Sequence, residues 1–180
     1  MTVKERLITT ASDLFYQNGY NNTGINEVIE KAKVAKASLY THFKTKDDLC
    51  IAYLRNKENG FLNDLEVFLK KKPKGKIKIL GLFDYLRDVY RQDDFKGSYS
   101  INILAEIPKE NTKIRNEVTS HRSNFKDFIH DLVKKNTTVK NSDKLTNRLY
   151  FLFEGALTES YVEQDSWPIK EAKDLALGLL

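Results

Sequence analysis

The chain has 180 residues, of which 41% are apolar, and it carries 30 basic against 25 acidic side chains. A chain of this length buries a core large enough to fold without a disulfide or a structural metal. Its single cysteine, Cys50, excludes an intrachain disulfide and is expected to be a buried thiol. The N-terminal segment lacks a signal-peptide apolar run, and no segment reaches the roughly 20 apolar residues of a membrane span. We therefore expect a cytoplasmic protein of one or two domains, because a lone thiol suits a reducing compartment.

Apolar residues recur at three- and four-residue intervals along nearly the whole chain, without the alternation of a strand. This spacing predicts an all-α protein of about nine helices. The first helix is expected to end at Asn18-Gly19, with Gly19 in the left-handed conformation that terminates helices. The second begins after Thr23, whose hydroxyl is expected to cap its first turn. The later helices are predicted over about 35 to 43, 46 to 70, 76 to 91, 99 to 106, 111 to 135, 142 to 163 and 168 to 180.

Residues 23 to 49 are the most informative stretch, because they predict two short helices joined by a tight turn and followed by the start of a third. This is the arrangement of a DNA-reading helix-turn-helix. Five lysines and His42, with no acidic residue, lie between Lys31 and Lys46. The polar side is therefore basic, as expected of a surface that meets a phosphate backbone. A merely solvated role for Lys31 and Lys44 stays open.

Several residues at fixed spacing carry a resemblance to a known family. They are Ala11, Leu14-Phe15, Gly19-Tyr20, Thr23, Ile25, Ile29, Val34, Leu39-Tyr40, His42-Phe43, Lys46 and Leu49. With these residues the first quarter of the chain resembles the DNA-binding domain of the TetR/AcrR family of transcriptional regulators. The resemblance implies a helix-turn-helix DNA-binding domain over residues 1–48 and an effector-binding and dimerisation domain over residues 49–180, with a helix over about 46 to 70 connecting them.

Three residues near the turn depart from the family pattern. Lys33 and Ala37 stand where the family has glycine, and Ala35 stands where a serine or threonine caps the recognition helix. A lysine at positive φ and a missing cap each cost on the order of 1 kcal/mol, which a packed domain tolerates.

The resemblance directs the recognition helix towards DNA. Lys36 is predicted to read a base edge, because an ammonium group donates to the guanine acceptors of the major groove. Phosphate contacts are predicted from Tyr40, His42 and Lys46, and from Thr23 at the amide end of the second helix. A packing role for Tyr40 is the alternative. The full set of predicted DNA-binding residues is Thr23, Lys36, Ala37, Ser38, Tyr40, Thr41, His42 and Lys46.

The segment from Leu149 to Leu157 is apolar almost all round, which predicts a helix that is covered on two sides. The second cover is either another subunit or the rest of the monomer. A homodimer is favoured, because two recognition helices about 34 to 36 Å apart enter successive major grooves of one DNA face. The predicted dimer residues are Leu149, Leu152, Gly155, Ala156, Leu175 and Leu179.

The resemblance also implies a small-molecule effector, and the aromatic content after residue 76 favours an apolar or aromatic one. The predicted pocket is lined by Phe83, Tyr90, Leu104, Phe125, Tyr150 and Phe153, with polar contacts from Asn102, Arg122 and Glu154.

No catalytic arrangement is evident. None of the three histidines has a second ligand at metal spacing, and Glu117 and His121, one helical turn apart, are expected to be a surface pair. Phosphate-binding glycine loops and nucleophile-base pairs are also missing. We therefore expect no enzyme, metal or cofactor, but a ligand-responsive regulator, most commonly a repressor, that binds a palindromic operator as a homodimer and is released by a small molecule. The alternative is a helical small-molecule-binding dimer that has lost specific operator binding.

Overall fold

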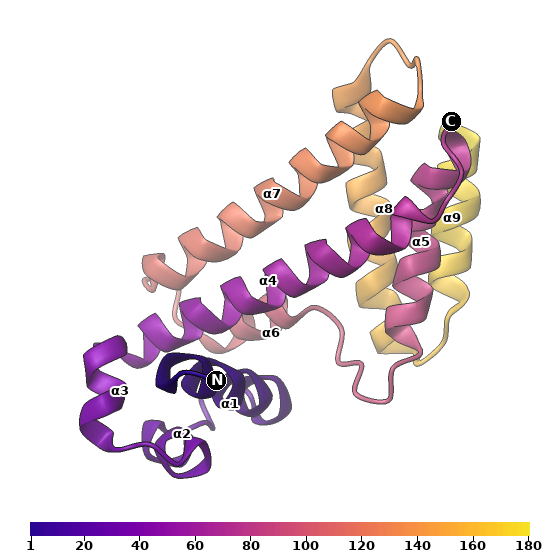
Figure 1. Ribbon diagram of the computed structural model, residues 1–180. Coiled ribbons are helices and arrows are strands. Elements are labelled where there is room, and N and C mark those ends of the chain that lie inside the picture. Colours follow the sequence, from indigo (N-terminus) through magenta and orange to yellow (C-terminus); the bar gives the residue numbers. More distant parts are fainter. The chain divides into compact units, whose positions relative to one another are not determined.

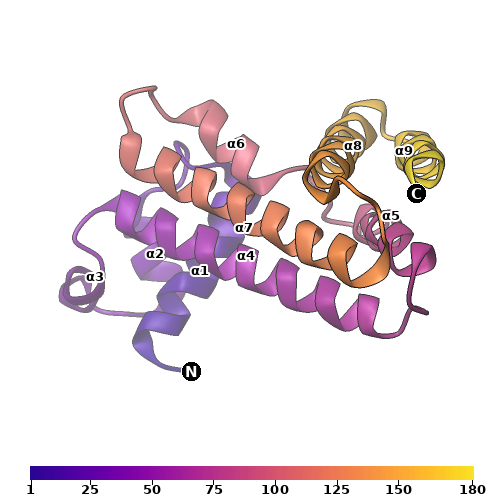
Figure 2. The same ribbon diagram turned by 90° about the horizontal axis from the view of Figure 1, so that it is seen from above.

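The computed structural model describes residues 1–180 as nine helices without a strand, which confirms the predicted fold class (Figures 1 and 2). The helices are α1 (Val3–Asn18), α2 (Ile25–Ala32), α3 (Lys36–His42), α4 (Lys46–Lys70), α5 (Lys76–Tyr90), α6 (Tyr99–Glu106), α7 (Thr112–Asn136), α8 (Ser142–Glu163) and α9 (Trp167–Leu179). The predicted helix ends agree with these bounds to within about two residues. None of the helices combines the length and apolarity needed to cross a membrane.

The chain forms two compact units. The head unit consists of Met1–Gly60 and Tyr99–His121, and the body unit consists of Phe61–Ser98 and Arg122–Leu180. Helices α4 and α7 therefore each contribute their first part to the head unit and the remainder to the body unit. The predicted boundary after residue 48 separates DNA binding from effector binding and dimerisation, and it stays a prediction.

In the head unit, α1, α2 and α3 gather at the N-terminal end of α4 (Figure 1). Helix α1 opens with a capping box, in which the Thr2 hydroxyl accepts from the Glu5 amide and the Glu5 carboxylate accepts from the Thr2 amide. Its apolar face is buried against the neighbouring helices. The core of the unit includes Leu7, Leu14, Phe15, Val28, Leu39, Leu49, Leu54, Ile103 and Ile114.

Helix α1 ends as predicted, but the turn that follows differs in two details. Gly19 has φ 88° and ψ 167°, a positive φ that lies outside the left-handed helical region. This backbone conformation favours glycine, and a Cβ at this position would also lie 2.5 Å from Oε1 at the end of the Glu106 side chain, which would have to move. The N-cap of α2 is Gly24, without a side-chain hydrogen bond, so the predicted cap by Thr23 is wrong.

In the body unit, α5, α8 and α9 pack side by side (Figure 2). Their core is largely aliphatic and aromatic, including Ile79, Leu82, Phe83, Leu149, Phe153 and Ile169. The lysine-rich residues 71–75 separate α4 from α5, as predicted. Gly75, with φ 89°, donates its amide proton to Asn136 Oδ1 at 3.0 Å, which ties this segment to the end of α7.

Candidate nucleic-acid interface

The turn between α2 and α3 has the predicted strain. Lys33 has φ 52° and ψ 52°, in the left-handed region, and its amide donates to the carbonyl oxygens of Ile29 and Glu30. Ala35 occupies the N-cap of α3 and offers no side-chain hydrogen bond. The turn therefore lacks two common local stabilisers, and packing must hold it in place. Val28 and Leu39 are fully buried and anchor the two helices.

Because Leu39 is buried in the core of the head unit, the opposite side of α3 faces solvent. Lys36, Ala37, Tyr40, Thr41 and His42 are exposed, and Ser38 is half-buried. Tyr40 is 49% exposed, so its ring is not part of the core. The helix carries no acidic residue, and the only side-chain hydrogen bond along it runs from the Thr41 hydroxyl to the Ala37 carbonyl at 2.9 Å. Six of the eight predicted DNA-binding residues thus lie on α3, five of them exposed and Ser38 half-buried.

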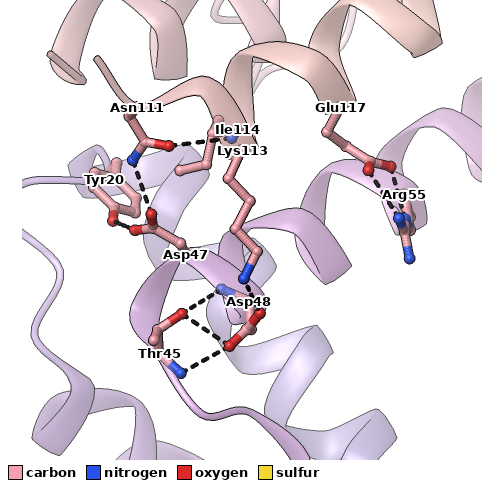
Figure 3. Close-up of polar contacts among 9 residues, drawn as sticks. All are labelled: Tyr20, Thr45, Asp47, Asp48, Arg55, Asn111, Lys113, Ile114 and Glu117. Carbon is pink, nitrogen blue, oxygen red and sulfur yellow. Dashed lines mark hydrogen bonds and ion pairs between the residues drawn. The ribbon is translucent and has the colours of Figure 1, made fainter. Parts of the chain in front are cut away.

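The start of α4 is fixed by a reciprocal pair (Figure 3). The Asp48 carboxylate accepts from the amide and hydroxyl of Thr45, at 2.9 and 2.8 Å, and the Asp48 amide donates to the Thr45 hydroxyl at 3.1 Å. Hydrogen bonds from Thr45 and Lys113, led by Lys113, lower the pKa of Asp48. The neighbouring Asp47 accepts from the Tyr20 hydroxyl and, at 2.9 Å, from the Asn111 amide group.

Lys46, a predicted phosphate ligand, is only half-exposed. Its ammonium lies 4.3 Å from the centroid of the Tyr20 ring and 3.5 Å from the Asn21 carbonyl oxygen. Burial lowers its pKa. The cation is thus held against the loop that joins α1 to α2, and its contact with a phosphate stays a prediction.

Thr23 does not belong to the accessible surface. Its side chain is fully buried, and its hydroxyl donates towards the carbonyl oxygens of Gly19, at 2.7 Å, and Leu14, at 3.2 Å. These carbonyls come from the last turn of α1 and the residue that follows it. The predicted phosphate contact of Thr23 is therefore wrong, because the hydroxyl closes the end of α1 and is not accessible to DNA.

The end of α6 and the start of α7 support the interface from positions far along the chain. Glu106 accepts from the Asn21 amide at 2.7 Å, and the Asn21 side chain donates to the Glu106 carbonyl at 2.8 Å. Lys113 forms an ion pair with Asp48, and Arg55 binds Glu117 through two hydrogen bonds of 2.7 and 2.8 Å (Figure 3). No local pattern in the sequence predicts these partners.

His121 corrects another expectation. Its Nε2 lies 3.0 Å from both Glu58 and Glu117, so the predicted pairing with Glu117 exists. The imidazole is only 6% exposed, however, so this is a buried cluster between α4 and α7 and not a surface pair. Cys50 is fully buried, as expected, and burial raises the pKa of its thiol to about 12.

Comparison with known proteins identifies the head unit. Residues 7–53 match the family model of bacterial regulatory proteins of the tetR family. Residues 7–53 thus form a tetR-family DNA-binding domain, and the chain as a whole resembles regulators of that family. The chain is 37% identical over 59 residues to the HTH-type transcriptional regulator QacR of Staphylococcus aureus. The matched residues are 33% of this chain and 31% of QacR. The chain is 25% identical over 130 residues to IcaR of Staphylococcus epidermidis, the negative transcriptional regulator of a biofilm operon, covering 72% of this chain and 66% of IcaR.

Solved structures extend the TetR-family likeness to the whole fold. The TetR-family regulator SCO4454 of Streptomyces coelicolor superposes with a TM-score of 0.85 at 26% identity, covering 97% of this chain and 88% of SCO4454. FadR of Bacillus subtilis, solved with stearoyl-CoA, shares the fold with a TM-score of 0.72 at 15% identity, covering 97% of this chain and 96% of FadR. The matching family model describes regulatory proteins, the class that the sequence predicts.

The predicted pocket residues are divided between the two units. Asn102 and Leu104 lie in the head unit. In the body unit, ring centroids lie 4.9 Å apart for Phe125 and Phe153 and 6.4 Å apart for Phe83 and Phe153. The predicted set is completed by Tyr90, whose ring contacts Phe95, and by Tyr150, Arg122 and Glu154.

Within that set, the polar residues lie beside the aromatic rings. Arg122 Nη1 lies 3.1 Å from Glu154 Oε2, and the guanidinium lies 5.4 Å from the Tyr150 centroid. Burial raises the pKa of Glu154 against the opposing effect of Arg122. The Tyr150 hydroxyl is buried without a hydrogen-bond partner. The aromatic residues thus contact one another closely and place two charged groups at the edge of the cluster.

The body unit also contains a groove that the sequence did not predict. Its volume is about 930 Å³, and it lies between the second half of α4, the start of α5 and the second half of α7. Leu62, Leu69, Phe128 and Leu132 supply apolar wall, and Lys70, Lys74, Lys78 and Lys135 supply charge. None of the predicted pocket residues lines it.

The predicted dimer residues have unequal exposure. Leu149 and Ala156 are buried in the body core, so their assignment to an interface is wrong: they lie on the inner side of α8. Leu152 and Leu179 are half-buried, and Gly155 and Leu175 are exposed. The apolar side chains most exposed on α8 and α9 include Phe151 at 73%, Val162 at 65% and Trp167 at 54%, which the prediction did not name.

Proposed function

We propose that this TetR-family chain is a transcriptional repressor that acts in the cytoplasm, binds a two-fold symmetric DNA operator as a homodimer, and is released by a small apolar or aromatic molecule. Residues 1–48 are assigned to DNA binding, and residues 49–180 to effector binding and dimerisation. The observation that carries the proposal is the exposed, acid-free side of α3, held by Leu39 and Phe43 in the head core. The naming of IcaR as a negative regulator supports repression.

Within this interface, Lys36 and Lys46 have different proposed roles. Lys36 is exposed on the first turn of α3 and is assigned to a base edge, because its ammonium donates to guanine O6 and N7. Lys46 lies beside the α1–α2 loop and is assigned to a phosphate. Base contacts supply sequence preference, whereas phosphate contacts act equally on every sequence.

The test is a fluorescence titration of a duplex selected for binding, repeated at increasing salt. Lys46→Ala is expected to weaken binding to selected and scrambled duplexes alike and to lower the salt slope by about one, since one fewer counterion is released. Lys36→Ala is expected to cost about 1 to 3 kcal/mol on the selected duplex and to relax preference at one base position. Lys140→Ala, which removes an exposed lysine of the body unit, serves as the control.

The same titration separates the proposal from a small-molecule-binding dimer that has lost its operator, an alternative favoured by the uncapped α3 and the strained Lys33. Equal wild-type affinity for selected and scrambled duplexes at every salt concentration supports that alternative and contradicts the proposal.

The effector is assigned to the body unit, for which two regions qualify. The Phe125–Phe153 cluster has Arg122 and Glu154 at its edge, and the α4–α7 groove has an apolar wall that includes Phe128. A panel of apolar and aromatic compounds is scored for saturable release of DNA. Loss of release in Phe125→Ala or Phe153→Ala assigns the effector to the cluster, and loss only in Phe128→Ala assigns it to the groove.

A further inference from the structure

A second cavity lies within the head unit and is not explained by DNA reading. Its volume is about 580 Å³, and its walls come from the start of α1, the end of α3, the first part of α4 and the start of α7. The volume is within the range of about 300 to 1,000 Å³ that is usual for small-molecule sites. We call this cavity the head cleft.

The charge of the head cleft is strongly one-sided. Its lining carries the permanent cations Lys4, Lys44, Arg55 and Lys113, together with His42, against the single carboxylate of Asp48. A concave surface lined by one sign of charge raises the local concentration of the opposite ion. The head cleft is therefore suited to an anion.

The cations of the head cleft differ in their partners. Lys113 forms an ion pair with Asp48, and Arg55 is bound by both carboxylate oxygens of Glu117. Lys4 and Lys44 are exposed and form no ion pair with a carboxylate of the chain. Two positive charges thus remain without neutralisation within one cavity, and a dianion matches them better than a monoanion does.

The remaining wall is apolar. Ile8, Phe43 and Ile51 line the cleft, and the side-chain amides of Asn56 and Asn59 lie on α4 beside them. Phe43 and Ile51 are themselves buried in the head core, so this wall is fixed in place. A ligand that fills the cleft therefore needs an apolar part in addition to its charge.

We propose that the head cleft binds a small phosphate monoester that carries an apolar ring. A phosphate monoester has a charge of about −1.5 to −2 at neutral pH and several acceptor oxygens, which suits two lysine ammonium groups. The ring lies against the half-buried side chains of Ile8 and Ala52, which also line the cleft. This site is distinct from the effector site assigned to the body unit.

Occupancy of the head cleft has a consequence for DNA binding, and this consequence alone rests on the proposed function. His42 belongs both to the cleft and to the exposed side of α3. A bound phosphate monoester therefore competes with a DNA phosphate for the same end of α3. Binding of the small ligand itself does not depend on whether the chain reads an operator.

Phenyl phosphate is the probe, with phenol and inorganic phosphate as its two halves, titrated calorimetrically into the full chain without DNA. Phenyl phosphate is expected to saturate one site per chain and to bind about tenfold more tightly than either half, which corresponds to about 1.4 kcal/mol. Backbone amide signals of Phe43 and Ile51 are expected to shift on binding in a nuclear magnetic resonance titration.

Lys4→Ala/Lys44→Ala is expected to weaken phenyl phosphate binding at least about tenfold, whereas Lys31→Ala/Lys109→Ala, which removes two exposed lysines outside the cleft, binds as the wild type does. Circular dichroism melting verifies that both variants fold. Equal affinity of Lys4→Ala/Lys44→Ala and the wild type overturns the proposal. A lack of saturable phenyl phosphate binding to the wild type also overturns the proposal. If Lys4→Ala/Lys44→Ala then weakens only DNA binding, the two lysines contact the DNA backbone and not a small ligand.

Discussion

Arg55 and Glu117 illustrate how single residues hold the head unit together. Two parallel hydrogen bonds join them, and His121 lies 3.0 Å from the same carboxylate. The hydrogen bonds from Arg55 are the main reason that the pKa of Glu117 lies below its ordinary value of 4.5. Glu117 is 14% exposed, whereas Arg55 is 64% exposed, so solvent screens part of the attraction.

This pair predicts a pH dependence of stability. A carboxyl group whose folded-state pKa is lowered stabilises the fold above its unfolded pKa and loses that contribution as pH falls through the folded value. The free energy of unfolding, measured by urea denaturation, is therefore expected to fall between about pH 5 and pH 3. Glu117→Gln is expected to lose about 1 kcal/mol at neutral pH and to show a shallower decline.

Glu110→Gln, which removes an exposed carboxylate without an ion pair, is the matched control and is expected to follow the wild-type curve. Parallel curves for Glu117→Gln and the wild type, at any offset, would show that the pair does not contribute to the acid sensitivity.

At this scale, residue positions could be predicted only where the signal is local. The exposed positions of α3 follow from helical spacing around Leu39. Thr23 could not be placed, because a threonine before a helix has the same local pattern whether it faces solvent or, as here, bonds back to α1. Glu106 and Asn111 bind residues 85 and 64 positions away, and such partners have no local pattern.

The α2–turn–α3 element is held together by packing at the expense of backbone preference. Lys33 lies in the left-handed region, and α3 begins without a side-chain cap. The buried Val28, Leu39 and Phe43 offset these costs. Both departures could be predicted, because the residue types at fixed positions of the turn decide them. Helix ends elsewhere were predictable for the same reason, with Pro168 in the first turn of α9 as one example.

Replacing the strained residue should stabilise this element. Lys33→Gly is expected to raise the free energy of unfolding by about 0.5 to 1 kcal/mol, because relief of the left-handed strain exceeds the entropy cost of a glycine. Lys31→Gly, two residues earlier inside α2, is expected to lower it by about 1 kcal/mol. Thermal denaturation of both variants compares them directly, and a lower stability for Lys33→Gly would show that the turn is not strained.

At the scale of the whole molecule, the exposed side of α8 and α9 favours assembly. Phe151, Gly155 and Val162 recur at helical spacing on α8, and Trp167 and Leu175 are exposed on α9. An apolar face of this kind on a charged surface is typical of a protein interface. The sequence predicted helix α8, which carries much of this face. It did not predict which side of α8 is exposed, because a run of apolar residues does not reveal which side the rest of the monomer covers.

Charge on this face should prevent dimerisation. Phe151→Glu is expected to sediment as a monomer at concentrations at which the wild type sediments as the proposed dimer, since a buried unpaired carboxylate costs several kcal/mol. Val67→Glu places the same charge at an exposed apolar position of α4 and is expected to leave the dimer intact. A dimeric Phe151→Glu would remove this face from the interface.

In the proposed dimer, two copies of α3 read neighbouring turns of one duplex. Selection of bound DNA from a random duplex pool tests it most directly. We predict a two-fold symmetric sequence with half-site centres about 34 to 36 Å apart, or a multiple of that spacing, because a symmetric dimer presents its recognition helices to successive major grooves. A selected pool without a shared sequence, or with a single unpaired half-site, would contradict the claim.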